Sequence, residues 1–111
     1  MRFILLLCGD EAAELALSPA ERRAIVDRHV EFAGRLRDRG AMIGGDPVTP
    51  STEGAVVRGG RVSDGPFAET KEQIGGYYLV ECAGRDEALD YARQVPASPG
   101  MAVEVRRLAD M

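Results

Sequence analysis

The chain contains one histidine, His29, and this is the side chain best suited to proton transfer at neutral pH. An unperturbed imidazole ionises near pH 6.5, so it can serve as a general acid or base. His29 falls on the apolar stripe of a predicted helix, where a core or interface histidine satisfied by one hydrogen bond is an equally good interpretation. A catalytic histidine needs an orienting partner, and the candidate carboxylates are Asp46, Asp64, Glu69, Glu72 and Glu104.

Asp64 opens the tetrapeptide Asp64-Gly65-Pro66-Phe67, which has the composition of a turn. In this interpretation Asp64 caps the turn, Gly65 adopts a positive φ and Phe67 anchors the loop in the core. We favour the turn over direct chemistry for the tetrapeptide as a whole. A carboxylate held on a rigid turn can serve both purposes, so Asp64 is our candidate partner for His29.

Two further pairs of residues are candidates for substrate contacts. Tyr77 and Tyr78 are neighbours in a predicted strand and therefore point to opposite faces, so only one of them can face a pocket. Glu104 and Arg106 share one face of the last predicted strand. Either they form an ion pair with each other, the simpler interpretation, or they hold an anionic substrate.

The element that carries His29 is a long helix. Ser18-Pro19-Ala20-Glu21 predicts its start, with serine at the N-cap and glutamate completing a capping box. An apolar stripe runs through the segment 25–36, and Gly40 predicts the end of the helix.

The other elements follow from apolar periodicity and turn residues. Strands are predicted over residues 2–8, 41–45, 77–82 and 101–108, a second helix over 85–94, and a hairpin over 55–63 that turns at Gly59-Gly60. Residues 10–17 are expected to form a loop or a single turn. The order predicts one α+β domain over 1–111, a ferredoxin-like βαββαβ sandwich with an extra hairpin arm.

Two helices can cover only one face of such a sheet. However, the strands over 2–8 and 77–82 have apolar residues at both odd and even positions, so both of their faces are apolar. A continuous exposed apolar face is rare on a stable monomer. We therefore expect a homodimer packed sheet on sheet.

Charge and composition exclude several classes of function. The net charge is −4 and the basic residues are dispersed, which disfavours nucleic-acid binding. The longest apolar run is too short to cross a bilayer, so we expect no membrane contact. The two cysteines, Cys8 and Cys82, give no disulfide framework and no zinc spacing, and we interpret them as reduced thiols of a cytoplasmic protein. No phosphate loop is present, and we expect neither cofactor nor metal.

The stretch 63–81, with its Asp-Gly-Pro-Phe start, resembles the signature of the DGPF-motif proteins within the YCII-related family. Residues 28–47 and 103–106 are similar to the helix-and-strand segment and the final strand of that family. The resemblance implies a ferredoxin-like fold that pairs into a dimeric α+β barrel. His29 matches the family histidine, but the aspartate of the D-P-[FY] motif after the second helix is absent, because residues 93–96 read Arg-Gln-Val-Pro.

The resemblance also suggests functions for the chain. YCII-type relatives are suggested to be enzymes with a His-Asp pair, and one branch is similar to dehydrohalogenases or lyases of ring substrates. The first hypothesis is a small lyase, isomerase or hydrolase with His29 as general acid or base, Asp64 orienting it, and substrate contacts from Tyr77, Tyr78, Glu104 or Arg106. The alternative is a non-catalytic ligand-binding or regulatory module, since DGPF-type proteins are often encoded beside extracytoplasmic-function sigma factors. Cofactor-free monooxygenase chemistry would rest on fold analogy alone.

Overall fold

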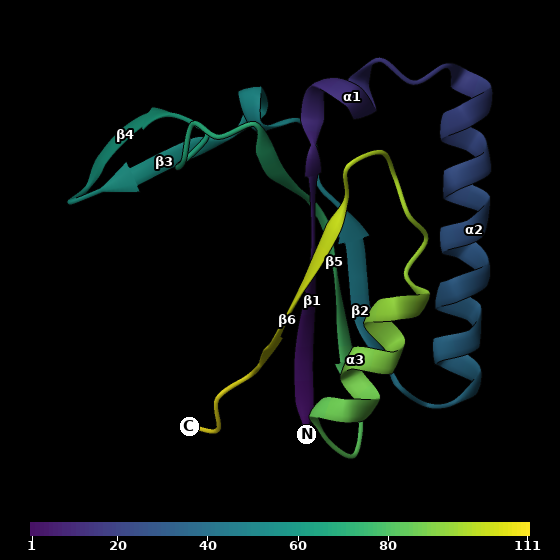
Figure 1. The fold of residues 1–111 in the computed structure, drawn as a ribbon. Coiled ribbons are helices and arrows are strands. Elements are labelled where there is room, and N and C mark those ends of the chain that lie inside the picture. Colours follow the sequence, from purple (N-terminus) through teal and green to yellow (C-terminus); the bar gives the residue numbers. More distant parts are fainter.

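The computed structural model describes residues 1–111 as a four-stranded sheet covered on one side by helices, with a separate hairpin (Figure 1). The elements in chain order are β1 (Arg2–Asp10), α1 (Glu11–Leu15), α2 (Pro19–Asp38), β2 (Met42–Pro47), the 3-10 turn η1 (Ser51–Glu53), β3 (Ala55–Arg58), β4 (Arg61–Asp64), β5 (Glu72–Glu81), α3 (Arg85–Gln94) and β6 (Ala102–Arg107).

The main sheet has the order β2-β5-β1-β6, and every neighbouring pair is antiparallel. Without the hairpin and the short helical segments α1 and η1, the order of elements is βαββαβ, with β1 and β5 in the centre of the sheet. This is the ferredoxin-like α+β arrangement predicted from the sequence. β5 begins at Glu72, five residues earlier than predicted, because its first residues pair with the end of β1.

The predicted signals bound α2 at both ends. The Ser18 hydroxyl accepts from the Glu21 amide at 3.1 Å, and the Glu21 carboxylate accepts from the Ser18 amide at 3.0 Å, which completes the capping box. Gly40 has φ 70°, and the Ala41 amide donates to the Leu36 carbonyl at 2.9 Å. No helix of the structure is both long and apolar enough to cross a membrane.

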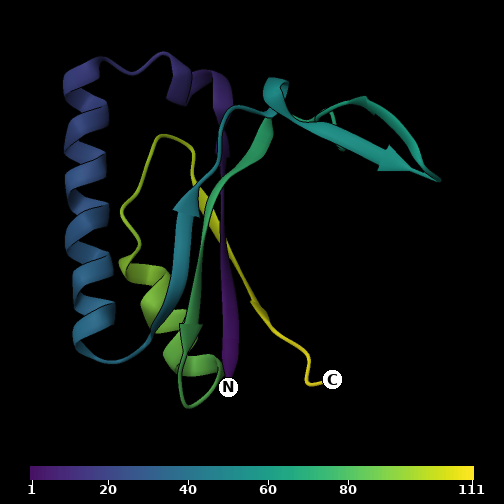
Figure 2. The same ribbon diagram turned by 180° about the vertical axis from the view of Figure 1, so that it is seen from behind.

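The packing of α2 against the sheet is uneven. Its only fully buried residues, Phe32 and Leu36, lie in the C-terminal half, where they join Leu5 and Val80 in the core. The N-terminal half of the helix contributes no fully buried residue. The contact of α2 with the core is therefore concentrated near the C-terminal end of the helix, which is the lower end of α2 in Figures 1 and 2.

The sheet face away from the helices, hereafter the open face, is partly apolar. Residues directly opposite in an antiparallel ladder share a face, so Leu6 lies beside Tyr77 and Glu104, and Ile4 lies beside Leu79 and Arg106. Ile4, Leu6 and Leu79 are only half-buried.

The hairpin of β3 and β4, hereafter the arm, forms its own two-stranded sheet and projects on the side opposite α2 (Figures 1 and 2). Gly59 and Gly60 have φ 55° and 80°, as a tight hairpin turn requires. Two expectations for the adjoining turn are wrong. Gly65 has no positive φ; instead a Cβ there would lie 2.9 Å from the Gly54 carbonyl carbon. Phe67 is 78% exposed, because the arm has no core to receive it, and its ring meets the Arg58 guanidinium.

Candidate functional site

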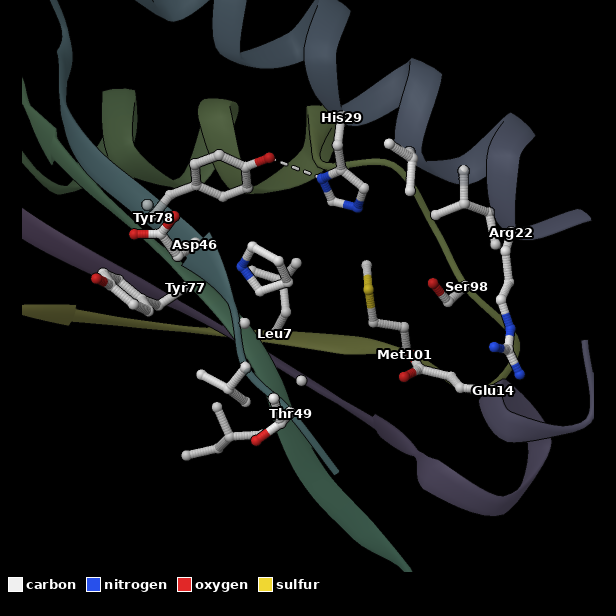
Figure 3. A pocket seen from close by; sticks show the side chains of 18 of the residues that line it. Leu7, Glu14, Arg22, His29, Asp46, Thr49, Tyr77, Tyr78, Ser98 and Met101 are labelled. Carbon is white, nitrogen blue, oxygen red and sulfur yellow. Dashed lines mark hydrogen bonds between the residues drawn. The ribbon is translucent and has the colours of Figure 1, made fainter. Parts of the chain in front are cut away.

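A cavity of about 590 Å³ lies between α2 and the helix-covered face of the sheet, and the part of α2 that lines it runs from Arg22 to Arg37 (Figure 3). Its floor comes from β1, β2 and β5, and α1 and the segment before β6 close one end. The walls are mainly apolar, with Leu7, Ile25 and Met101 among them. Val26 and Val30, which line the cavity, are 57% and 62% exposed, so its mouth opens to solvent along α2.

His29 lines this cavity and is held by a hydrogen bond to Tyr78. The distance between His29 Nδ1 and Tyr78 Oη is 2.7 Å, and the bond links α2 to β5. The Tyr78 ring also packs edge-on against Phe32, with 5.0 Å between ring centroids. Figure 3 shows the other ring nitrogen of His29, Nε2, pointing into the cavity.

The surroundings favour the neutral form of both rings. Burial, with a smaller contribution from the Arg28 charge, lowers the pKa of His29 from 6.5. Burial raises the pKa of Tyr78 above 10.0. At pH 7 the pair is therefore a neutral imidazole and a neutral phenol. The tautomer of His29 decides whether Tyr78 donates or accepts, and hence whether Nε2 offers the cavity a lone pair or a proton.

Gly45 makes room for the Tyr78 ring. It lies directly opposite Tyr78 in the ladder of β2 and β5. A Cβ at Gly45 would lie 2.7 Å from Tyr78 Cδ1 and 2.7 Å from the Tyr77 carbonyl oxygen. The Tyr78 ring thus packs directly against the backbone of Gly45, and this packing orients the Tyr78 hydroxyl toward α2.

The structure places the predicted site residues on three separate surfaces. Tyr78 lies at His29. Tyr77 is also among the residues that line the cavity, but it belongs to the opposite face of β5, and in Figure 3 its ring points away from His29. Glu104 and Arg106 lie on the open face and form an ion pair at 3.7 Å, as the simpler interpretation expected.

Asp64 lies in the arm, opposite Ala55, and does not line the cavity. Within one chain, the orienting partner of His29 is therefore the Tyr78 hydroxyl and not the Asp64 carboxylate. The sequence shows that Asp64 belongs to a turn motif. A local motif does not show where in the fold the turn lies, or whether it is near His29.

Gly45, Glu14 and Arg22 are among the cavity residues that the sequence analysis did not identify. Glu14 belongs to α1, a segment with too weak a helical pattern to orient its side chains from sequence. The one available signal was the Gly44-Gly45 pair, because glycine inside a strand indicates close approach of another group. No group of three or more His, Cys, Asp or Glu residues is placed to hold a metal ion.

Comparisons with known proteins agree on one family. The family model of the YCII-related domain matches residues 1–111. An uncharacterized protein of Rhizobium meliloti (strain 1021) is 38% identical over 121 residues, which cover 98% of this chain and 93% of the relative.

The lowered pKa of His29 predicts a pH dependence of stability. As pH falls below about 6.5, the unfolded chain takes up the imidazole proton before the folded chain does, so the free energy of unfolding declines. His29→Gln removes this contribution. Urea unfolding at pH 7.5 and 5.5 should show a larger loss for the wild type than for His29→Gln. Equal losses would show that the folded and unfolded chains bind this proton alike.

Gly45→Ala should displace the Tyr78 ring, because the new methyl group would clash with it. Overpacking of this kind costs about 1–3 kcal/mol, which urea unfolding can measure. Gly44→Ala is the matched control, since a Cβ at Gly44 meets nothing within 4 Å. If the two variants unfold at the same urea concentration, Gly45 is not what positions the ring.

Proposed function

The chain belongs to the YCII-related family, and from this premise we propose that it is a small enzyme of the lyase, isomerase or hydrolase type with His29 as its general acid or base. One observation carries the proposal: the only histidine lines an open apolar cavity, with Nδ1 engaged by Tyr78 and Nε2 free for a substrate. This geometry is what a positioned general base requires.

Tyr78 takes the orienting role in this proposal. When Nδ1 carries the imidazole proton, it donates a hydrogen bond to Tyr78 Oη. Nε2 then has a lone pair and can remove a proton from a substrate. The resulting imidazolium keeps its bond to Tyr78 and returns the proton later. Asp46, Glu11 and Glu14 line the same cavity, but none of them contacts the His29 ring, which agrees with the lowered pKa of His29. Such a weak base suits substrates whose proton is already acidic, such as one next to a carbonyl group or on a phenol.

The cavity also limits the substrate. A volume of about 590 Å³ lies within the usual range for pockets that bind small organic molecules. Side chains such as Leu7, Ile25 and Met101 provide an apolar wall, so the body of the substrate is apolar, with a polar group at His29.

A non-catalytic ligand-binding or regulatory module is the second candidate. It is favoured by the absence of a carboxylate at His29, which an efficient histidine base commonly has. The same cavity would then bind its ligand without turnover. The two candidates are separated by whether His29 changes a reaction rate or only an affinity.

We further propose that two copies pair through their open faces, in the cytoplasm. Half-buried Ile4, Leu6 and Leu79 give this face an apolar centre. The arm supports the same proposal, because an isolated two-stranded hairpin is at best marginally stable in water. A second copy would cover the face and give the arm a surface to pack on.

The catalytic proposal can be tested with 5-nitrobenzisoxazole, an apolar probe whose ring opens to a coloured phenolate when a base removes its C3 proton. We expect the protein to accelerate this reaction, with a rate that rises with pH through a midpoint below 6.5. His29→Gln should lower the rate roughly 10²-fold or more, the usual contribution of a positioned base.

Tyr78→Phe should lower the same rate by a smaller factor, since it removes the orienting bond and leaves the base. Tyr91→Phe is the matched control, because Tyr91 is buried at α3 and lies outside the cavity. Equal rates for the wild type and His29→Gln, with the probe bound by both, would reject the enzyme in favour of the binding module.

The dimer can be tested by light scattering at micromolar concentration, where we expect the mass of two chains. Leu6→Glu should give the mass of one chain, because it places a carboxylate beside Glu104 in the middle of the open face. Ala24→Glu, on an exposed position of α2, should remain dimeric. A wild-type mass of one chain would contradict the proposal.

A further inference from the structure

Glu14 is a second polar group of the cavity, at the end opposite the C-terminal half of α2. It belongs to α1, its side chain is half-buried, and it lines the same cavity as His29 (Figure 3). The short helix α1 is held by the Asp10 side chain, which accepts from the Ala13 amide at 3.2 Å. This cap fixes the first turn of α1, and with it the backbone from which the Glu14 side chain extends.

Two glycines form the surface on which the Glu14 carboxylate lies. A Cβ at Gly9 of β1 would be 3.1 Å from Oε1, and a Cβ at Gly75 of β5 would be 3.5 Å from Oε2. Gly75 is the extra residue of a β-bulge, because Leu7 pairs with Gly76 and Cys8 with Ile74. Bulges often occur beside functional sites, where they redirect the chain. Here two strands leave space for one carboxylate.

This carboxylate has no partner in the protein. Its oxygens make no hydrogen bond, and no cationic group lies within 4.0 Å of them. Arg22, the cation that lines the same end of the cavity, donates to the Leu15 carbonyl at 2.7 Å instead. In contrast, Glu11 in the same helix accepts from both the amide and the hydroxyl of Ser51.

We propose that Glu14 binds the protonated amine of a ligand whose apolar body fills the cavity. The inference rests on the proposed function and deepens it by naming the substrate class: organic amines with an aromatic or aliphatic body. A charge-assisted hydrogen bond from an ammonium group compensates a partly desolvated carboxylate, and a carboxylate ligand would be repelled. The neutral imidazole of His29 does not repel the cation.

Three probes of one size and different charge test this inference: benzylamine, benzyl alcohol and benzoate, titrated into the full chain at pH 7 by calorimetry. We expect benzylamine to bind roughly five- to tenfold more tightly than benzyl alcohol, the difference between a charged and a neutral hydrogen bond, and benzoate to bind most weakly. Glu14→Gln should remove the preference for the amine. Glu31→Gln, the matched control at an exposed position of α2 outside the cavity, should keep it.

Each other outcome overturns a defined part of the account. If benzyl alcohol binds as tightly as benzylamine, or if Glu14→Gln keeps the preference, the amine class is wrong while the cavity stands. If benzoate binds most tightly, Arg22 and not Glu14 selects the ligand. If none of the three binds, the cavity does not accept small apolar molecules, and the proposed function fails with the inference.

Discussion

The cavity exists because only two residues of α2, both in its C-terminal half, are fully buried in the core. Phe32 and Leu36 fix the C-terminal half in the core, and the capping box fixes the start of the helix to its own backbone rather than to the sheet. A rigid helix that is fixed by these two residues keeps its direction, so other residues of α2 that face the sheet, such as Ile25 and His29, line open space. His29 lies near the boundary between the two halves, where one edge of its ring meets Tyr78 and the other meets the cavity.

The hydrogen bond between His29 and Tyr78 gives the imidazole an uncharged partner. A carboxylate partner would stabilise an imidazolium, whereas a buried phenol does not, and both pKa shifts favour the uncharged pair. Gly45 and the glycines near Glu14 contribute in the same way, by letting a polar side chain lie against bare backbone. Glycines in β1, β2 and β5 therefore shape the two polar ends of a cavity whose walls are otherwise apolar.

Most of the fold could be predicted from local signals. The capping box, Gly40 and the Gly59-Gly60 turn each act within a few residues, and each is confirmed. The site was less predictable because it depends on contacts between distant segments. Strand alternation indicated that only one of Tyr77 and Tyr78 could face a pocket, but the choice between them depends on how β5 pairs with β2. Asp64 and Phe67 were misplaced for a related reason, since no local pattern shows that the arm leaves the body of the protein.

The proposed function requires that the cavity present a neutral, accessible imidazole to small molecules. Because His29 is the only histidine, diethyl pyrocarbonate tests this claim directly: the reagent acylates neutral imidazole, and absorbance near 240 nm counts the modified groups. We expect one modified histidine per native chain at pH 7. A native chain that resists the reagent, and reacts only after unfolding in urea, would show that His29 is sealed in the core and would contradict the account.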